Sequence, residues 1–512
     1  MRTTTRIQTA LVGAAVLAMG AAALPAVAQA GAAEPVGLGR YYSQHIDWHD
    51  CALGSDDATG RKLDAAGARC ADLTVPLDYT DPGGRTITVA VSRLSATDPA
   101  HSVGPMLFND GGPGGEGLDM PLRMGAVMGK VAGKYDLIGM DPRFVGRSTP
   151  LDCGWDIGSA IFSAGHDRAA FNRSVAIQRD LAERCRRTNG DVLPYVTTRN
   201  TARDMDVVRG ALGAKRMSYL GYSYGSYLGE VYTQLFPGRT DRMVLDGVVH
   251  PDEYSQTLLA GAEPANERSL HAWAAWAADR NATYRLGDTS DAVLATVDRI
   301  QRAAAEKPLR IGDFRLDEHF VPVVFFGGLG SDLDDRRASL AAMVQVLARA
   351  ADRDPGVRPG LEMAELLTFL TTEAGSQPAS VQAAIICGDV ATRRGIDSYW
   401  RAVQATRVDY PLAGPLANNI SPCEFWGSPA EAPTVVDNDV PALLVNATGD
   451  PRTLYSGALR IRHQWSESRL ITVPGAIQHG VYGEYGNACV DKRVNAYLAT
   501  GRLPEHDLTC RK

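Results

Sequence analysis

The feature that most constrains the fold of this 512-residue chain is a serine between two glycines, in the run GYSYG at residues 221–225. Residues 217–220 are apolar and typical of a strand, and residues 226–236 carry apolar side chains at helical spacing. A strand that runs directly into a helix leaves room only for a sharp turn, which glycines permit because they lack a Cβ atom. We therefore expect Ser223 to stand clear of the backbone at a helix N-terminus, as a nucleophile would.

Two later segments supply the groups that activate such a serine. A serine nucleophile needs a general base and an acid that orients the base, and after a G-x-S-x-G turn the acid precedes the histidine along the chain. Asp450 lies in the loop after a predicted strand at residues 442–446, and His479 lies in the loop after the next one at 469–473. Because the carboxyl ends of parallel strands meet at one edge of a sheet, we expect both residues to lie near Ser223.

A glycine-rich loop at residues 111–117 follows an earlier predicted strand, 105–109. Such a loop exposes backbone N–H groups, so we expect the N–H groups of Gly112 and Tyr224 to form an oxyanion hole. The same loop fits the dinucleotide-binding pattern G-x-G-x-x-G, with Asp141 following at the end of a strand. That alternative leaves the serine, acid and histidine unexplained, and a proline inside the turn is unusual for it, so we favour the oxyanion loop.

Strand-like and helical segments alternate in two parts of the chain. The strand-like segments are 86–93, 105–109, 135–140, 217–221, 242–245, 442–446 and 469–473. Between the two parts the pattern is helical only. We therefore expect an α/β fold with a mostly parallel sheet and an inserted helical cap. The expected divisions are a signal peptide (1–30), the first part of the core (31–250), the cap (251–435) and the second part of the core (436–512).

The N-terminus has the pattern of a secretory signal peptide. Arg2 and Arg6 precede an apolar run at residues 11–24, and Ala28-Gln29-Ala30 is an A-x-A cleavage signal. No later segment approaches the ~20 apolar residues of a membrane span. We expect cleavage near Ala30 and a secreted, extracellular protein without a membrane anchor. The formal net charge of −7, with the charges interspersed, argues against a nucleic-acid partner.

Eight cysteines lie beyond the expected cleavage site. An even number in an exported chain indicates disulfides, although eight cysteines allow many connectivities. The simplest hypothesis is sequential pairing: Cys51–Cys70, Cys153–Cys185, Cys387–Cys423 and Cys489–Cys510. The chain has no C-x-x-C, and His45-x-x-x-His49 has no further ligand cluster nearby, so we expect no metal site.

Four segments carry a resemblance to a known family: the loop GGPGG at 111–115, DPRFVGRS at 141–148, GYSYG and LDGVV at 245–249. Together they resemble the proline iminopeptidase branch of the α/β-hydrolases. Residues 40–512 are most similar to secreted tripeptidyl aminopeptidases of actinobacteria, whose C-terminal region carries a cysteine pair like Cys489 and Cys510. The resemblance implies an α/β-hydrolase fold, a serine exopeptidase that releases short peptides from free N-termini through an acyl-enzyme, and no cofactor.

Two residues are candidates for substrate binding, because an exopeptidase must hold the free α-ammonium group with a carboxylate. Glu116, in the oxyanion loop, is the first candidate, and Asp389 in the cap is the second. One alternative function is a secreted esterase or amidase acting on a small metabolite, because the same triad serves both chemistries. Another is a catalytically silent binding protein, against which the intact triad argues. The expected partner is a peptide or small-molecule substrate, and the sequence does not indicate an oligomeric state.

Overall fold

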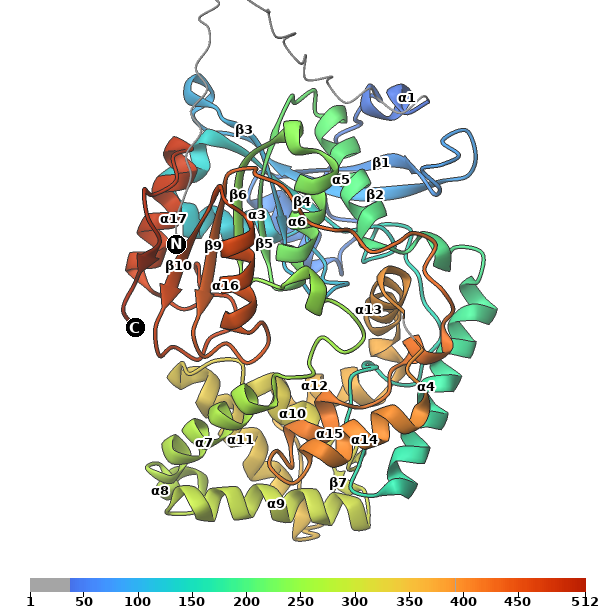
Figure 1. Ribbon diagram of the computed structural model, residues 1–512, viewed down its shortest axis with the longest axis vertical. Coiled ribbons are helices and arrows are strands. Elements are labelled where there is room, and N and C mark those ends of the chain that lie inside the picture. Colours follow the sequence, from blue (N-terminus) through green and yellow to red (C-terminus); the bar gives the residue numbers. More distant parts are fainter. Residues whose placement is uncertain (1–36, 392) are drawn as a thin grey trace, which may run out of the picture. The chain divides into compact units, whose positions relative to one another are not determined.

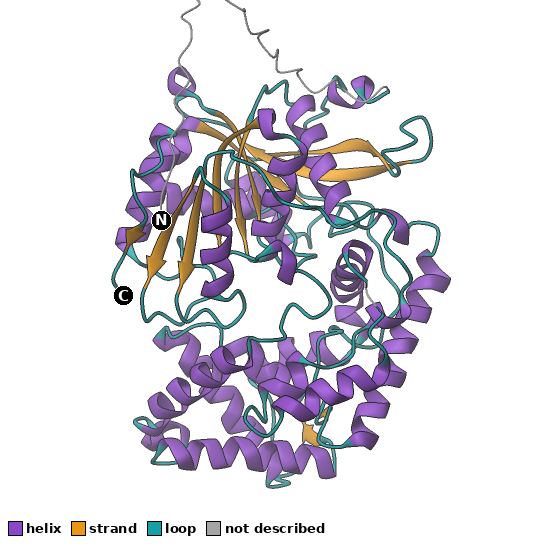
Figure 2. Cartoon of the chain, viewed as in Figure 1, coloured by secondary structure: helices purple, strands orange, loops and turns teal. Residues whose placement is uncertain are grey.

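The first and last parts of the chain together form a nine-stranded sheet (Figures 1 and 2). The computed structural model describes residues 37–391 and 393–512, so the expected signal peptide lies outside the described residues. The strands lie in the order β1-β2-β4-β3-β5-β6-β9-β10-β11. Their bounds are β1 (Arg69–Pro76), β2 (Thr86–Leu94), β3 (Gly104–Asn109), β4 (Tyr135–Met140), β5 (Met217–Tyr222), β6 (Thr240–Asp246), β9 (Ala442–Ala447), β10 (Ser468–Val473) and β11 (Leu508–Thr509). All neighbouring strands from β4 to β11 run parallel, whereas β2 is antiparallel to β1 and β4, which confirms the expected mostly parallel sheet.

Helices cover both faces of the sheet, which is why its central strands are mainly apolar. Every residue of β5 and of β9 is buried. One face is covered by α5 (Thr198–Ala211), α6 (Tyr224–Leu235) and α16 (Tyr455–Gln464), and here Val231 packs in the same core as Leu245. The other face is covered by α3 (Met120–Met128) and α17 (Ala488–Thr500), and here Met124 and Val494 share a core with Leu220.

The segment between β6 and β9 is mainly helical and has a hydrophobic core of its own, which includes Trp273, Val297 and Phe325 (Figure 1). Its elements include α7 (Glu263–Ala278), α8 (Asn281–Tyr284), α9 (Ser290–Glu306), β7 (Leu309–Ile311), β8 (Phe314–Leu316), α10 (Val321–Gly328), α11 (Asp334–Ala351), α12 (Leu361–Thr371), α13 (Ser376–Asp389), α14 (Ile396–Thr406), α15 (Ala413–Ala417) and the 3-10 helix η7 (Pro422–Phe425). The β7–β8 pair interrupts a stretch in which the sequence indicates helices only. We propose that residues 251–435 form a cap domain.

One helix from the first part of the chain packs with this helical group. The long helix α4 (Arg168–Asn189) lies between β4 and α5 in the sequence, yet its Phe171 and Val175 pack with Tyr399 of α14 and with Ile420. A helix that precedes the nucleophile turn therefore adds to the proposed cap. Sequence order alone does not reveal this, because the pairing joins segments more than two hundred residues apart.

The eight cysteines form four disulfides in the sequential pairs that the sequence analysis expects: Cys51–Cys70, Cys153–Cys185, Cys387–Cys423 and Cys489–Cys510. The third pair joins α13 to η7 within the helical group, and the fourth joins α17 to the chain just after β11. Among the described residues, no helix is both long enough and apolar enough to cross a membrane.

Candidate active site

Ser223 occupies the turn between β5 and α6, with φ +55° and ψ −123°. This conformation is strained for a residue with a side chain and is held by close packing on both sides. A Cβ atom on Gly221 would lie 2.3 Å from the carbonyl oxygen of Gly225, and one on Gly225 would lie 2.8 Å from the carbonyl oxygen of Asn109. The two glycines are therefore needed for the turn that exposes Ser223.

The side chains of Asp450 and His479 are hydrogen-bonded at the same edge of the sheet. His479 Nδ1 lies 3.0 Å from Asp450 Oδ2 and 3.1 Å from Oδ1. The Asp450 carboxylate, 2% exposed, also accepts bonds from the Thr453 hydroxyl (2.7 Å) and from the backbone N–H groups of Arg452 (2.8 Å) and Thr453 (3.1 Å). These donors stabilise the ionised acid, which in turn keeps the proton of His479 on Nδ1 and leaves Nε2 free to accept one.

Ser223 and His479 line one cavity, although no hydrogen bond joins their side chains in the described part of the chain. Catalytic hydrogen bonds are often long in unliganded enzymes and shorten when substrate binds. The structure thus brings the serine, the acid and the histidine of the sequence analysis to one place, at the carboxyl ends of β5, β9 and β10.

Asp246, at the end of β6, supports the loop that carries His479. Its carboxylate accepts hydrogen bonds from the backbone N–H groups of Val481 (2.9 Å) and Tyr482 (2.7 Å). Burial raises the pKa of Asp246 to about 7, against the lowering effect of these bonds and of the nearby His479. Gly247 follows with φ +64°, and a Cβ atom there would lie 3.4 Å from His479 Cε1. The segment LDGVV contributes to the resemblance above, but sequence reasoning did not find this role of Asp246.

The glycine-rich loop after β3 packs directly against the nucleophile turn. A Cβ atom on Gly111 would lie 2.6 Å from the carbonyl oxygen of Tyr222. Gly112 has φ +109° and lines the same cavity as Ser223. Tyr224 is the first residue of α6, so its N–H has no acceptor within the helix. The two expected oxyanion donors therefore belong to segments that meet at Ser223.

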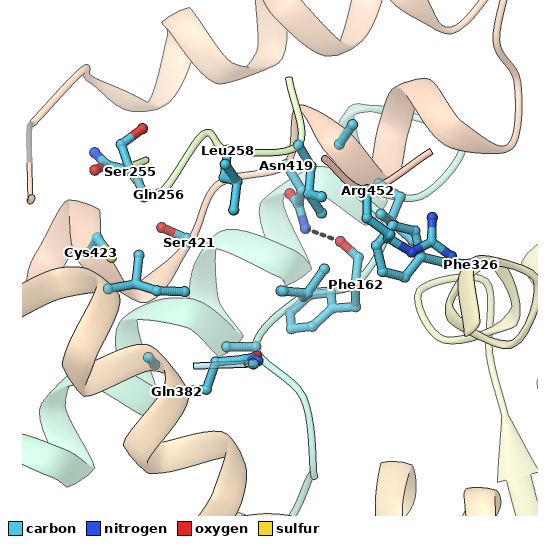
Figure 3. A pocket seen from close by; sticks show the side chains of 18 of the residues that line it. Phe162, Ser255, Gln256, Leu258, Phe326, Gln382, Asn419, Ser421, Cys423 and Arg452 are labelled. Carbon is cyan, nitrogen blue, oxygen red and sulfur yellow. Dashed lines mark hydrogen bonds between the residues drawn. The ribbon is translucent and has the colours of Figure 1, made fainter. Parts of the chain in front are cut away.

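The cavity has a volume of about 380 Å³, which is within the usual range for small-molecule sites. The sheet edge supplies Gly112, Ser223, Thr453 and His479 to its lining. Most of the remaining wall is apolar and comes from the helical group and the chain before α4. Its larger apolar residues are Ile161, Phe162, Leu258, Leu259, Phe326, Ile386, Leu416 and Ile420, several of which appear in Figure 3.

Comparisons with known proteins agree with this arrangement. A family model described as an alpha/beta hydrolase fold matches residues 104–315, and one described as TAP-like protein matches residues 410–510. The tripeptidyl aminopeptidase of Streptomyces lividans is 34% identical over 485 residues, which cover 91% of this chain and 86% of that protein. The chain belongs to the tripeptidyl aminopeptidase family of α/β-hydrolases.

Two further relatives have names that indicate different activities, one a protease and one an esterase. Serine protease Hip1 of Mycobacterium tuberculosis is 29% identical over 510 residues, which cover 91% of each chain. Carboxylesterase B of the same species is 29% identical over 529 residues, which cover 96% of each chain. Among solved structures, the proline iminopeptidase of Mycobacterium smegmatis is 14% identical and aligns over 84% of this chain and 100% of its own, with a TM-score of 0.34.

Glu116, the first candidate for binding the α-ammonium group, does not line the cavity that Ser223 lines. Glu116 lines a different cavity, together with Asp119 and Asp141, and its pKa is raised by burial and by these two acids. The oxyanion loop turns toward β4 immediately after its glycines, because Asp141 Oδ1 accepts a hydrogen bond of 2.9 Å from Gly117 N. Glu116 therefore lines a cavity other than the one that Ser223 lines.

The second candidate, Asp389, is also absent from the lining of the catalytic cavity. Its buried carboxylate accepts bonds from Thr198 N (2.7 Å), Thr198 Oγ1 (2.6 Å) and the Tyr254 hydroxyl (3.1 Å). Because the Thr198 hydroxyl donates to Asp389, it accepts from the Tyr224 hydroxyl, 2.6 Å away. Asp389 thus joins α13 to α5 and, through Thr198, to the residue that follows the nucleophile. It supports the wall of the site from outside the cavity lining.

We expect Asp389 to make stability depend on pH. Burial raises its pKa from the usual 3.8 to about 7, so between pH ~4 and ~7 the folded state holds a proton that the unfolded state releases. The contribution of Asp389 to the free energy of unfolding is fully present below pH ~4 and is lost as the pH rises to ~7. The Asp389→Asn variant, which cannot titrate, should flatten the decline of the unfolding free energy by up to about 1.4 kcal/mol per pH unit.

Denaturant unfolding at a series of pH values measures this decline. The matched control is Asp313→Asn, at an exposed acid in the turn between β7 and β8, which should retain the wild-type slope. Equal slopes for the wild type and Asp389→Asn would show that Asp389 does not titrate in this range.

Proposed function

We propose that this protein is a serine exopeptidase that releases short peptides, three residues long, from free N-termini through an acyl-enzyme. One observation carries the proposal: Ser223, on a strained turn, shares a cavity with His479, whose Nδ1 is hydrogen-bonded to Asp450. The membership of the tripeptidyl aminopeptidase family supports it.

The mechanism follows from the positions of these groups. Ser223 Oγ attacks the scissile carbonyl carbon while His479 Nε2 takes the hydroxyl proton, and Asp450 stabilises the imidazolium that forms. The N–H groups of Gly112 and Tyr224 stabilise the negative charge on the tetrahedral oxygen. His479 then gives the proton to the leaving amine as the C–N bond breaks. In the second half, water loses a proton to His479 and attacks the acyl carbon, and Ser223 leaves with that proton. This chemistry requires no cofactor.

The walls of the cavity favour a substrate whose enclosed part is a short acyl group. Its walls come from the sheet edge on one side and from the helical group on the other, so an extended protein chain would have to leave it on the side of the scissile bond. The apolar lining favours substrates with apolar side chains. We propose that the helical group limits the number of residues released.

A second function is favoured by a specific observation. Neither predicted amine-binding carboxylate lines the cavity, and Asp110, the one acidic residue that the described part of the chain contributes to the lining, forms an ion pair with Arg123. A mostly apolar cavity without an available carboxylate suits an esterase or amidase that acts on a small metabolite. The relative named carboxylesterase B, which is 29% identical and aligns over 96% of each chain, supports this second function.

A substrate profile distinguishes the two functions. We expect kcat/KM for a tripeptidyl 4-nitroanilide to exceed that for the matching aminoacyl and dipeptidyl compounds by about 10-fold or more, because binding energy from remote residues is used at the reacting carbonyl. Short-chain 4-nitrophenyl esters and an N-acetylated tripeptidyl 4-nitroanilide are the comparison substrates, and Ser223→Ala measures the background. Equal rates on acetylated and free peptides, with ester hydrolysis dominant, would move the esterase function ahead.

We also propose that the protein is exported. Four disulfides are typical of proteins that fold in an oxidising compartment. The signal-peptide pattern of the first thirty residues points to the same location.

A further inference from the structure

An arginine lies at one end of the catalytic cavity. Arg452 follows the acid Asp450 by two residues and lines the cavity together with Ser223 and His479. Its guanidinium lies over the ring of Phe326, with Cζ 3.5 Å from the ring centroid. Figure 3 shows the two side chains against each other, across the cavity from Ser255 and Gln256.

The side-chain amide of Asn266 holds Arg452 in position, and the hydrogen bonds of Asn266 define which way its oxygen points. Asn266 Nδ2 donates to the carbonyl oxygens of Ala262 (3.0 Å) and Pro451 (2.8 Å), so Asn266 Oδ1 must face the other way. Arg452 Nη1 donates to that oxygen at 2.7 Å. One core loop and two elements of the helical group, α7 and α10, therefore build this end of the cavity together.

The opposite edge of the guanidinium has no partner in the part of the chain that the structure describes. Nε–H and one Nη2–H of an arginine are parallel and form the edge that binds a carboxylate through two hydrogen bonds. Among the described residues neither Nε nor Nη2 of Arg452 has an acceptor, and Arg452 takes part in no ion pair. Asp450, the nearby acid, is already bonded to His479 and Thr453. Arg452 remains cationic at neutral pH, because burial lowers its pKa only to about 10.

Arg143 shows how this protein treats an arginine with a purely structural role. Arg143 is fully buried, and its Nε and Nη2 each lie 2.6 Å from an oxygen of Asp204. Its remaining N–H groups donate to backbone carbonyls. A buried charge without such a partner is costly, and Arg452, whose Nη2 is buried without an acceptor among the described residues, belongs to the lining of the catalytic cavity.

We propose that Arg452 forms a subsite of the catalytic cavity that binds a carboxylate of the substrate. The proposal rests on the assignment of this cavity as the catalytic site. Two sources supply the same chemistry: an acidic side chain near the scissile bond, and the C-terminal carboxylate of a short peptide. Either group would complete the bidentate pair that Asp204 completes for Arg143, while Phe326 and Asn266 hold the guanidinium in place.

The test uses two matched substrate pairs with the wild-type enzyme. One pair consists of tripeptidyl 4-nitroanilides with Glu or Gln at the same position, varied over the three positions in turn. The other consists of tetrapeptides that end in a free carboxylate or in an amide. We expect the carboxylate member of at least one pair to have a kcat/KM about 10-fold or more higher, mainly through a lower KM. The pair that responds identifies the source of the carboxylate.

The variant Arg452→Gln should lose this preference and still hydrolyse the neutral member of the pair. Arg280→Gln is the matched control, because Arg280 also lies over an aromatic ring, Trp276, at 4.2 Å, but is outside the cavity lining. The control should keep the wild-type preference. The proposal fails if the wild type treats both members of both pairs alike, or if Arg452→Gln keeps the preference.

A second measurement does not depend on peptide turnover or on the variant. A fluorophosphonate probe labels the nucleophilic serine of active serine hydrolases, which is Ser223 in this protein. Ligands that occupy the cavity slow this labelling. A tripeptide with a carboxylate should protect Ser223 of the wild type at about 10-fold lower concentration than its neutral analogue. Labelling without hydrolysis of any peptide would overturn the proposed exopeptidase function alone, whereas equal protection by both ligands would overturn the subsite.

Discussion

The Ser223→Ala variant is expected to fold normally and to lose about 10³-fold or more in kcat. Oγ of Ser223 supplies the bond to the acyl group, and the turn that carries it is built by Gly221 and Gly225, which the substitution leaves in place. The loss should appear with peptide and ester substrates alike, because both pass through the same acyl-enzyme. Initial rates on a tripeptidyl 4-nitroanilide, with thermal unfolding as the check on folding, measure it.

Three further variants test whether the triad acts as a unit. His479→Ala and Asp450→Ala should each reduce kcat strongly, and Ser223→Ala combined with His479→Ala should be no worse than the serine variant alone. Ser339→Ala, on the distant helix α11, is the control for a lost hydroxyl and should retain activity. Near-normal turnover by folded Ser223→Ala would falsify the assignment of the nucleophile.

Replacing both Cys387 and Cys423 by serine is expected to lower the free energy of unfolding by about 2–4 kcal/mol and to reduce activity as well. The bridge closes a loop between residues 36 apart in the sequence, and its removal frees the unfolded chain from that constraint. Both cysteines also line the catalytic cavity. Losing the bridge therefore loosens the wall formed by α13, which through Asp389 also supports the residue after the nucleophile.

The double variant Cys489→Ser with Cys510→Ser is the matched control, because its bridge spans 21 residues and lies outside the cavity lining. It should lose comparable stability but keep the wild-type kcat in the folded fraction. Denaturant unfolding and kcat measured on the same preparations separate the two effects. If both double variants lose activity in equal proportion, the wall of the cavity is not what the Cys387–Cys423 bridge supports.

The local features of this fold are encoded in neighbouring residues. The seven strands expected from apolar runs correspond to β2 to β6, β9 and β10, with ends that differ by no more than two residues. The sharp turn at Ser223 follows from its flanking glycines, and the acid and the histidine follow from their places after strands in a parallel sheet. Each of these inferences depends on the chain within a few residues of the site, or on a rule of chain order. Strand β1, which pairs with β2 at the edge of the sheet, and the two-residue strand β11 are not among the expected strands.

What the sequence alone could not determine is where its charged side chains meet other segments. Glu116 belongs to the oxyanion loop in sequence, but a hydrogen bond to Asp141 draws the end of that loop toward β4. Asp389 accepts a hydrogen bond from Thr198, which is nearly two hundred residues away in the sequence. The role of Asp246 and the unpaired edge of Arg452 likewise depend on contacts between distant segments. The physical reason is that a turn is governed by local sterics, whereas the partner of a buried charge is selected by packing and desolvation over the whole fold. The sequence by itself therefore determined the fold class and the candidate reactive groups, and the tertiary structure decided which charged residues line the catalytic cavity.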